Sequence, residues 1–140
     1  SGLALDSFRA LPIPETRGLI TWRIGEQGFD MMLSGQVPGE LGQALKSSNA
    51  AVAEALKGVE LWAVHPGGRT ILDAVEEGLG LPKEALAASR AVLGEFGNTS
   101  SSTVMFVLQR LMMQSHKGAR GCAMSFGPGL TAETMRFTAA

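Results

Sequence analysis

The chain contains 140 residues, of which 45% are hydrophobic and 18% are charged, and its formal net charge is −1. That length fits one compact domain, and the composition excludes a disordered or fibrous protein. Because the charge is close to zero, the chain lacks the clustered basic surface that binding to a nucleic-acid backbone requires, and we expect no nucleic-acid partner.

Apolar runs in the sequence are short. Residues 104–108 form one of the longest, far below the roughly 20 residues that a membrane-spanning helix needs, and the N-terminus shows no charged-then-apolar signal pattern. We therefore expect a cytoplasmic protein with no membrane partner. Cys122 is the only cysteine, which excludes an intrachain disulfide and a zinc site built from several thiolates; we expect no metal site.

The N-terminal part of the sequence predicts an extended segment followed by a hairpin. Residues 1–18 contain two prolines and show little periodicity, which is typical of an extended lead-in. Residues 19–24 (LITWRI) and 29–33 (FDMML) suit two strands, and the GEQG between them supplies hairpin chemistry.

The middle of the chain predicts two helices around a strand. The first helix begins near Pro38 and ends at Gly58, because apolar residues recur between them at helical spacing: Leu41, Leu45, Val52 and Leu56. Residues 61–64 (LWAV) are continuously apolar, the pattern of a central strand covered on both faces. The second helix ends at Gly80, and its apolar face consists of Ile71, Leu72, Val75 and Leu79.

The remaining sequence predicts two helices and two strands. Pro82 can open a helix that Gly97 ends. The capping residues of NTSSST precede a helix, over residues 104–113, that is apolar nearly all round and is expected to be central. Alternating apolar residues indicate strands at 122–126 and around 135–137, separated by the FGPGL turn. The order, roughly ββαβαααββ, indicates an α/β sandwich of a mixed β-sheet and covering helices.

His65 ends the apolar run and is followed by a proline and two glycines. A single histidine in such a place is often structural, with its ring nitrogens bound to backbone groups. However, ligand sites gather at the carboxyl ends of strands in α/β sheets, and Gly67 and Gly68 would let the backbone approach a ligand at a helix start. A neutral imidazole there could donate a hydrogen bond to an oxyanion or act as an acid or base.

Asn98 precedes a helix, and its simplest interpretation is an N-cap or turn residue. In combination with His65 it has a second interpretation. An imidazole and an amide that point N–H groups at the same carbonyl would form an oxyanion hole.

Three motifs of the sequence resemble one known family. His65 stands in WAVHPGGRTILDAVEEGLGL, Asn98 stands in GNTSSSTVMFVL, and FGPGLTAET lies near the end of the chain. In order and spacing they resemble the C-terminal half of a type III polyketide synthase, from the chalcone and stilbene synthase family of the thiolase superfamily. The resemblance begins at about Leu11. It implies a thiolase-like half, one half of an αβαβα sandwich, over residues 19–140.

The resemblance also implies roles. In that family a cysteine carries the acyl group, while a histidine and an asparagine stabilise the enolate left when malonyl-CoA is decarboxylated; His65 and Asn98 match those two residues. The substrates are coenzyme A thioesters, and no cofactor is bound. Gly67, Gly68 and Thr70 match the helix start that meets the CoA arm. The positions that match the substrate cavity are Trp22, Met31, Ser100, Phe126, Gly127 and Pro128.

Several of these positions also allow a structural interpretation. Met31 stands where the family commonly has a gatekeeper phenylalanine, but it could equally be ordinary core packing. Trp22 and Ser100 could be structural as well. Ser125 stands where the family usually has glycine, and its side chain could narrow the cavity or face away from it.

The sequence lacks one group that the family needs. The nucleophilic cysteine of the family lies in the N-terminal half, and we expect Cys122 to be a small buried apolar residue instead. We therefore expect the chain alone to be inactive, its partners to be acyl-CoA substrates and the missing N-terminal half, and the complete protein to be a homodimer.

Two other functions stay open from the sequence. Initiating ketoacyl-acyl carrier protein synthases share the fold and a Cys-His-Asn triad, but they usually follow the histidine with a Gln-Ala-Asn type of run instead of HPGG. The missing nucleophile also fits a non-catalytic module for acyl-CoA binding or dimerisation, although such a module has no need of His65 and Asn98.

Overall fold

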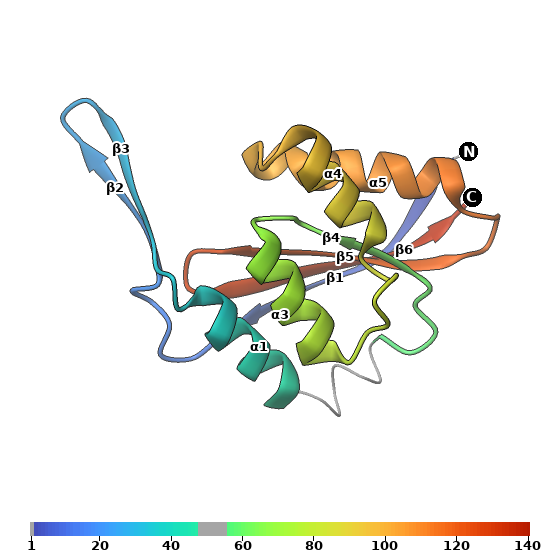
Figure 1. The fold of residues 1–140 in the computed structure, drawn as a ribbon, viewed down its shortest axis with the longest axis horizontal. Coiled ribbons are helices and arrows are strands. Elements are labelled where there is room, and N and C mark those ends of the chain that lie inside the picture. The colour runs from blue at the N-terminus through green and yellow to red at the C-terminus, as the bar shows by residue number, and fades with distance from the viewer. Residues whose placement is uncertain (1, 48–55) are drawn as a thin grey trace.

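A computed structural model describes residues 2–47 and 56–140 of the chain. A four-stranded mixed sheet forms its centre (Figure 1). In spatial order the strands are β1 (Leu3–Pro12), β6 (Thr131–Ala139), β5 (Arg120–Gly127) and β4 (Leu61–Val64). The β1–β6 and β6–β5 pairs are antiparallel, whereas β5 and β4 are parallel. The mixed α/β fold predicted from the sequence is confirmed.

Helices cover both faces of this sheet (Figure 1). The helices α1 (Val37–Ser47) and α3 (Arg69–Leu79) share one apolar core with Trp62, Val64, Cys122 and Met124 of the sheet. The helices α4 (Ala87–Phe96) and α5 (Thr103–Gln114) share a second core with Ala63, Ala123 and Phe137. Successive residues of β4 and β5 therefore point into opposite cores, as the pleat of a strand requires.

The strand over residues 61–64 is buried on both faces as predicted, but it is not central. It is the last strand of the four in the described sheet. A continuous apolar run indicates that both faces of a strand are buried. It does not indicate whether the strand has one or two neighbouring strands.

The segment before the hairpin forms β1, a strand that the sequence analysis did not assign. Its residues pair with β6 from Leu3–Ala139 to Pro12–Thr131, with a register shift near Asp6. Almost all of its side chains are exposed, including Leu5 and Phe8. A strand is predicted from alternating apolar and polar residues, and this alternation arises when one face is buried. Because both faces of β1 are exposed, its sequence does not show that pattern.

Several helix boundaries agree with the sequence. Pro38 lies in the first turn of α1, and Gly80 and Gly97 cap α3 and α4 with φ of 63° and 71°. Two details differ. The helix expected to open at Pro82 begins at Ala87, after a turn in which Ala85 N–H donates to the Pro82 carbonyl. Leu56 lies in a turn, and Val52 falls outside the described residues.

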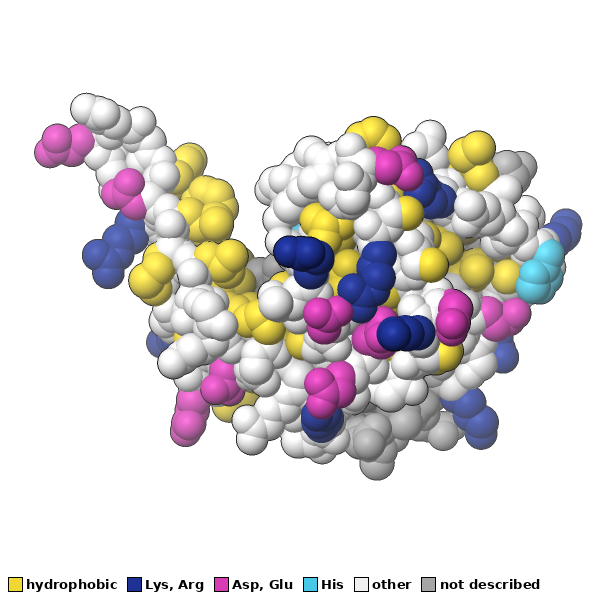
Figure 2. All heavy atoms as spheres, in the orientation of Figure 1, with side chains coloured by type: hydrophobic (Ala, Val, Ile, Leu, Met, Phe, Trp, Pro, Cys, Tyr) yellow, Lys and Arg dark blue, Asp and Glu magenta, His cyan; other side chains and the backbone are white. Residues whose placement is uncertain are grey.

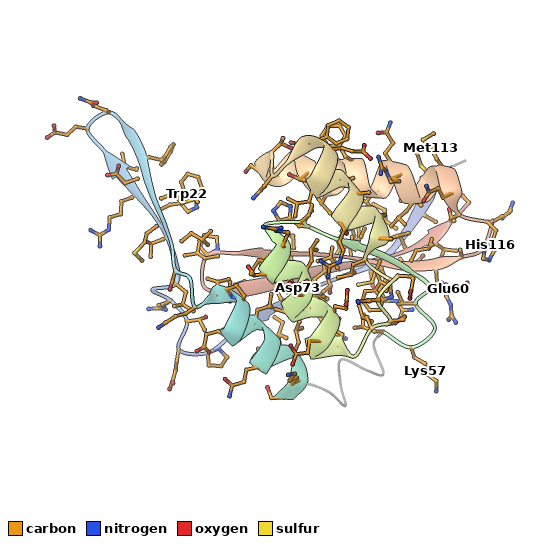
Figure 3. The ribbon with its side chains drawn as sticks, in the orientation of Figure 1. Trp22, Lys57, Glu60, Asp73, Met113 and His116 are labelled. Atoms are coloured by element: carbon orange, nitrogen blue, oxygen red, sulfur yellow. The ribbon has the colours of Figure 1, made fainter. Side chains whose placement is uncertain are left out.

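The helix α5 is buried on one side only. Its inner residues are Thr103, Val107, Leu108 and Leu111. Its outer side exposes Met105, Phe106 and Met113, with Met113 78% accessible, and Figure 3 shows Met113 pointing away from the sheet. Apolar residues therefore lie on both sides of α5, as predicted, but only the inner side is buried in this chain.

The predicted hairpin is formed by β2 (Ile20–Gly25) and β3 (Gly28–Leu33). It projects from the body as a separate arm (Figures 1 and 3). None of the helices in the described part of the chain is long and apolar enough to cross a membrane.

We predict that Gly121→Ala destabilises the chain. Gly121 pairs with Phe137 between β5 and β6, and a Cβ at position 121 would overlap the Phe137 ring, which is fully buried. Overpacking of this kind costs about 1–3 kcal/mol, which lowers the midpoint of thermal unfolding by roughly 3–12 °C. Calorimetry or circular dichroism measures this shift.

Gly94→Ala is the matched control, because Gly94 lies in α4 with open space around its Cα. In a helix that change is neutral or stabilising, by up to about 1 kcal/mol. Equal midpoints for the two variants would contradict the close contact between Gly121 and Phe137.

Candidate active site

The position of His65 follows from strand pairing. Its backbone N–H donates to the Met124 carbonyl at 2.7 Å, which extends the parallel β4–β5 ladder by one residue. Pro66 is fully buried, and the Gly67 N–H donates back to the His65 carbonyl at 2.9 Å. The chain thus turns immediately after β4, and α3 begins at Arg69.

The His65 imidazole is half-buried at the mouth of a cleft. Burial lowers its pKa, because desolvation disfavours the charged ring. Neither ring nitrogen has a hydrogen-bond partner among residues 2–47 and 56–140. A Cβ at Gly67 would lie 3.8 Å from Nε2, so glycine at this position leaves that edge of the ring uncovered. The ring is a neutral donor or acceptor that is available to a ligand.

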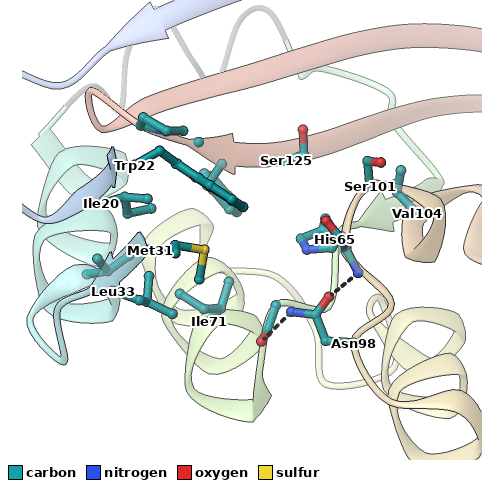
Figure 4. Close-up of a pocket in the computed structure, with 16 residues that line it drawn as sticks. Ile20, Trp22, Met31, Leu33, His65, Ile71, Asn98, Ser101, Val104 and Ser125 are labelled. Atoms are coloured by element: carbon teal, nitrogen blue, oxygen red, sulfur yellow. Dashed lines mark hydrogen bonds between the residues drawn. The ribbon is translucent and has the colours of Figure 1, made fainter. Parts of the chain in front are cut away.

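Asn98 comes from the opposite helical layer, one residue after the cap of α4. Its Nδ2 donates to the Gly67 carbonyl at 3.2 Å, and its Oδ1 accepts the Ser100 N–H at 2.9 Å (Figure 4). The second bond fixes which end of the amide is nitrogen, because a flipped amide would face the N–H of Ser100 with another donor.

The Asn98 amide has one N–H group that is not used in the bond to Gly67. Nδ2 carries two hydrogens, and one of them is used by Gly67. Figure 4 shows the Asn98 and His65 side chains at the same end of the cleft. A neutral imidazole, which can donate or accept a hydrogen bond, and an amide with one free N–H therefore lie at one site. The bond from Asn98 to Gly67 links the amide to the turn that carries His65.

The cleft has a volume of about 570 Å³. Its residues come from the hairpin, the starts of α1, α3 and α5, the HPGG turn, the loop before α5, and the end of β5 with the turn that follows it. They are Ile20, Trp22, Met31, Leu33, Val37, His65, Gly67, Ile71, Asn98, Ser100, Ser101, Val104, Ser125, Phe126, Gly127 and Pro128. Figure 2 shows the hollow between the hairpin and the body, with apolar side chains along the hairpin side.

Most residues selected from the sequence lie in this cleft. His65, Asn98 and Gly67 line it together with all six cavity positions, which are Trp22, Met31, Ser100, Phe126, Gly127 and Pro128. Gly68 and Thr70 do not line it. Gly68 is the N-cap residue of α3, and Thr70 is exposed in the first turn of that helix.

Sequence reasoning missed seven lining positions or left them open. Ser125 lines the cleft, so its side chain does not simply face away. The other six are Ile20, Leu33, Val37, Ile71, Ser101 and Val104. Ile20 and Leu33 could have been found, because they lie two residues from Trp22 and Met31 on the same face of the hairpin.

The hairpin wall is a ladder of apolar cross-strand pairs. Ile20 pairs with Leu33, and Trp22 pairs with Met31. Both pairs line the cleft, and Figure 4 shows Met31 and Trp22 across from His65 and Asn98. Trp22 also makes an edge-to-face contact with Phe29, with ring centroids 5.8 Å apart. The wall opposite His65 and Asn98 is therefore apolar.

Cys122 takes no part in the cleft. It is fully buried in the core between the sheet and α1 and α3. Burial raises the pKa of its thiol to about 11, which disfavours the thiolate that a nucleophilic cysteine needs. The expectation of a small buried apolar residue is confirmed.

Comparison with known proteins agrees with this geometry. Residues 5–139 match the family model of chalcone and stilbene synthases, C-terminal domain. Bisdemethoxycurcumin synthase from Oryza sativa subsp. japonica is 38% identical over 138 residues, which cover 88% of this chain and 34% of that protein. The crystal structure of PKS-I from the brown algae Ectocarpus siliculosus superposes with a TM-score of 0.84 at 34% identity, over 99% of this chain and 40% of that one. The chain thus spans between one third and two fifths of the length of these relatives.

We predict that His65 titrates below the ordinary histidine pKa of about 6.5. The folded chain then binds fewer protons than the unfolded chain just below that pH. The free energy of unfolding therefore decreases as the pH falls from about 6.5 through the folded-state pKa. NMR titration of the His65 ring protons measures the pKa directly.

The variant His65→Gln assigns the resonance and should remove this part of the pH dependence. A titration midpoint at or above 6.5 would show that the imidazole is solvated or has an acidic partner, in contradiction to the described burial.

Proposed function

Because the chain belongs to the chalcone and stilbene synthase family and is the C-terminal domain of a type III polyketide synthase, we propose that it provides the two enolate-stabilising groups of an acyltransferase. The complete enzyme decarboxylates malonyl-CoA and condenses the product with an acyl-CoA starter. The observation that carries this proposal is the pair of neutral polar groups, the His65 imidazole and the Asn98 amide, at one end of the cleft.

Decarboxylation creates the charge that these groups would stabilise. When malonyl-CoA loses CO₂, the electron pair of the broken C–C bond delocalises onto the thioester oxygen. Neutral donors that are already in place stabilise that oxyanion in the transition state without reorganisation, and loss of one such donor typically costs about 100- to 1,000-fold in rate. A neutral His65 fits this role, because burial already disfavours its charged form.

The condensation step balances with a cysteine thioester. The enolate carbon attacks the carbonyl of an acyl group held on the nucleophilic cysteine, a C–C bond forms, and the cysteine leaves as thiolate. The negative charge thus moves from the enolate oxygen to sulfur, and the product is a ketoacyl-CoA. Cys122 is excluded as that cysteine by its position in the core, so the nucleophile comes from the portion of the protein that this chain lacks.

The cleft fits a thioester substrate in its shape and lining. The apolar hairpin wall suits the acyl portion. Gly67, Gly68 and Thr70 lie at the turn and helix start after β4, and we propose that they meet the CoA arm. Coenzyme A thioesters are thus the proposed substrates, and no bound cofactor is invoked.

The exposed apolar side of α5 fits a proposed interface with an N-terminal half. Met105, Phe106 and Met113 of α5 are between 41% and 78% exposed, and Phe106 stacks on the exposed Phe96 at 5.5 Å. Apolar surface gathered on one helix marks an interaction site more often than chance exposure. We propose that the missing half covers this side of α5.

We predict that, in the complete protein, His65→Gln and Asn98→Ala each lower the rate of malonyl-CoA decarboxylation by about 100- to 1,000-fold. The assay measures CO₂ release with no starter present. His116→Gln is the matched control, because the His116 side chain is 74% exposed and lies far from the cleft near Glu60 (Figure 3). Unchanged decarboxylation in the Asn98→Ala protein would remove the basis of the proposal.

We also predict that the 140-residue chain alone self-associates through α5. Replacing Met105, Phe106 and Met113 together by serine should shift the chain toward monomer in light scattering, because it removes the exposed apolar surface. Gln109→Ser, on the exposed side of the same helix, is the control. A wild-type chain that stays monomeric across a concentration series would argue against an uncovered interface.

A further inference from the structure

Thr103 is a fully buried polar residue at the first position of α5. Its hydroxyl accepts the Thr99 N–H at 2.8 Å and lies 2.8 Å from the Ser100 carbonyl. It also lies 3.2 Å from the Thr99 hydroxyl and 3.4 Å from Asn98 Oδ1. One side chain therefore contacts each of the three residues that precede Ser101.

A hydroxyl has one proton to donate, so these contacts compete. The proton goes to the Ser100 carbonyl, because that distance is 2.8 Å while the distance to Asn98 Oδ1 is 3.4 Å. The oxygen then accepts from the Thr99 N–H, whereas the Thr99 hydroxyl has the Ser102 hydroxyl as a nearer acceptor, at 3.0 Å instead of 3.2 Å. The Thr103 hydroxyl thus both donates and accepts within this loop.

The loop needs this support, because Ser100 has a φ of 64°. That left-handed conformation is unfavourable for a residue with a side chain and persists only where the surroundings enforce it. Thr103 holds Ser100 from both sides, through the Thr99 N–H before it and through the Ser100 carbonyl itself. The hydroxyl therefore stabilises the one strained residue of the loop.

The strained conformation directs the Ser100 N–H at Asn98. That N–H donates to Oδ1 at 2.9 Å, and this bond sets the orientation of the amide, with Nδ2 toward Gly67 and the cleft. If Ser100 relaxed, Asn98 would lose the donor that distinguishes its oxygen from its nitrogen. A chain of contacts thus runs from the core, through Thr103 and Ser100, to the Asn98 amide.

We propose that Thr103 is a positioning residue for Asn98. Its buried hydroxyl holds the peptide groups on both sides of the Thr99–Ser100 peptide, and the N–H of that peptide in turn orients the Asn98 amide toward the enolate oxygen. This inference rests on the proposed function of Asn98. It assigns to Thr103 a contribution to the decarboxylation rate, although its side chain does not line the cleft.

The test compares Thr103→Val with Thr103→Ser in the complete protein. Valine keeps the shape but removes the hydroxyl, whereas serine keeps the hydroxyl. We expect Thr103→Val to lower kcat for malonyl-CoA decarboxylation by about 10- to 100-fold, as misplacement of a catalytic group does, with KM changed less than twofold. Thr103→Ser should stay within about threefold of wild type. If Thr103→Val does not fold, Thr103→Ala provides the same comparison.

A double-mutant cycle separates positioning from general destabilisation. If Thr103 acts through Asn98, Thr103→Val should lower the residual rate of an Asn98→Ala protein by less than twofold. A crystal structure of the Thr103→Val protein should show the bond between Ser100 N and Asn98 Oδ1 lengthened or lost.

Each outcome decides the inference. An equal loss of rate from Thr103→Val in the wild-type and Asn98→Ala backgrounds would mean that Thr103 only supports the fold, and a wild-type rate for Thr103→Val would overturn the inference too. In both cases a defective Asn98→Ala protein would leave the proposed function intact. A fully active Asn98→Ala protein would instead overturn the proposed function and this inference with it.

Discussion

The parallel pairing of β4 with β5 is the constraint on which the candidate site depends. The last paired residues are Val64 and Met124, and the bond from His65 N–H to the Met124 carbonyl continues the ladder. Parallel strands run toward the same edge of a sheet, so the HPGG turn after β4 and the FGPG segment at the end of β5 both lie there and line the cleft. The register cannot slip by one residue, because Ala123 and Met124 would then exchange cores of different size.

The Asn98 side chain makes a polar contact between the second helical layer and that edge. Asn98 lies beyond α4, yet its amide donates to the carbonyl of Gly67, in the turn that carries His65. The loop around it is rich in hydroxyl groups, which satisfy backbone groups that no helix or strand satisfies. A polar loop of this kind can hold a strained residue at a defined place, which an apolar loop cannot do.

The sequence predicted the parts of this arrangement that have local signals. The apolar run 61–64, the hairpin and the glycines that cap α3 and α4 all lie where their patterns indicated. The strand β1 was not predicted, because its partner β6 lies at the other end of the chain and its side chains are exposed. The predicted start of α4 at Pro82 was wrong, because a proline that suits a helix start suits a turn equally well.

The residues of the candidate site also fall into those that the sequence could indicate and those that it could not. His65 and Asn98 each allow a structural interpretation alone, and they could be selected because together they can form an oxyanion hole and stand in two motifs that resemble one family. The apolar lining could not be selected in full, because Val37 and Ile71 carry the same signal as any residue of a core face. Thr103 could not be selected as a positioning residue from the sequence. Its proposed role depends on hydrogen bonds to the Thr99 N–H and the Ser100 carbonyl, which no sequence spacing predicts.

The apolar face of the hairpin indicates where the cleft is incomplete. Its three cross-strand pairs lie on one face, but only the inner two pairs line the cleft. The outer pair, Ile24 and Phe29, is 89% and 69% exposed. An exposed apolar face of this kind on a hairpin is typical of an interaction surface. The proposed N-terminal half, which would also bring the nucleophilic cysteine, can cover this face and close the cleft opposite His65 and Asn98.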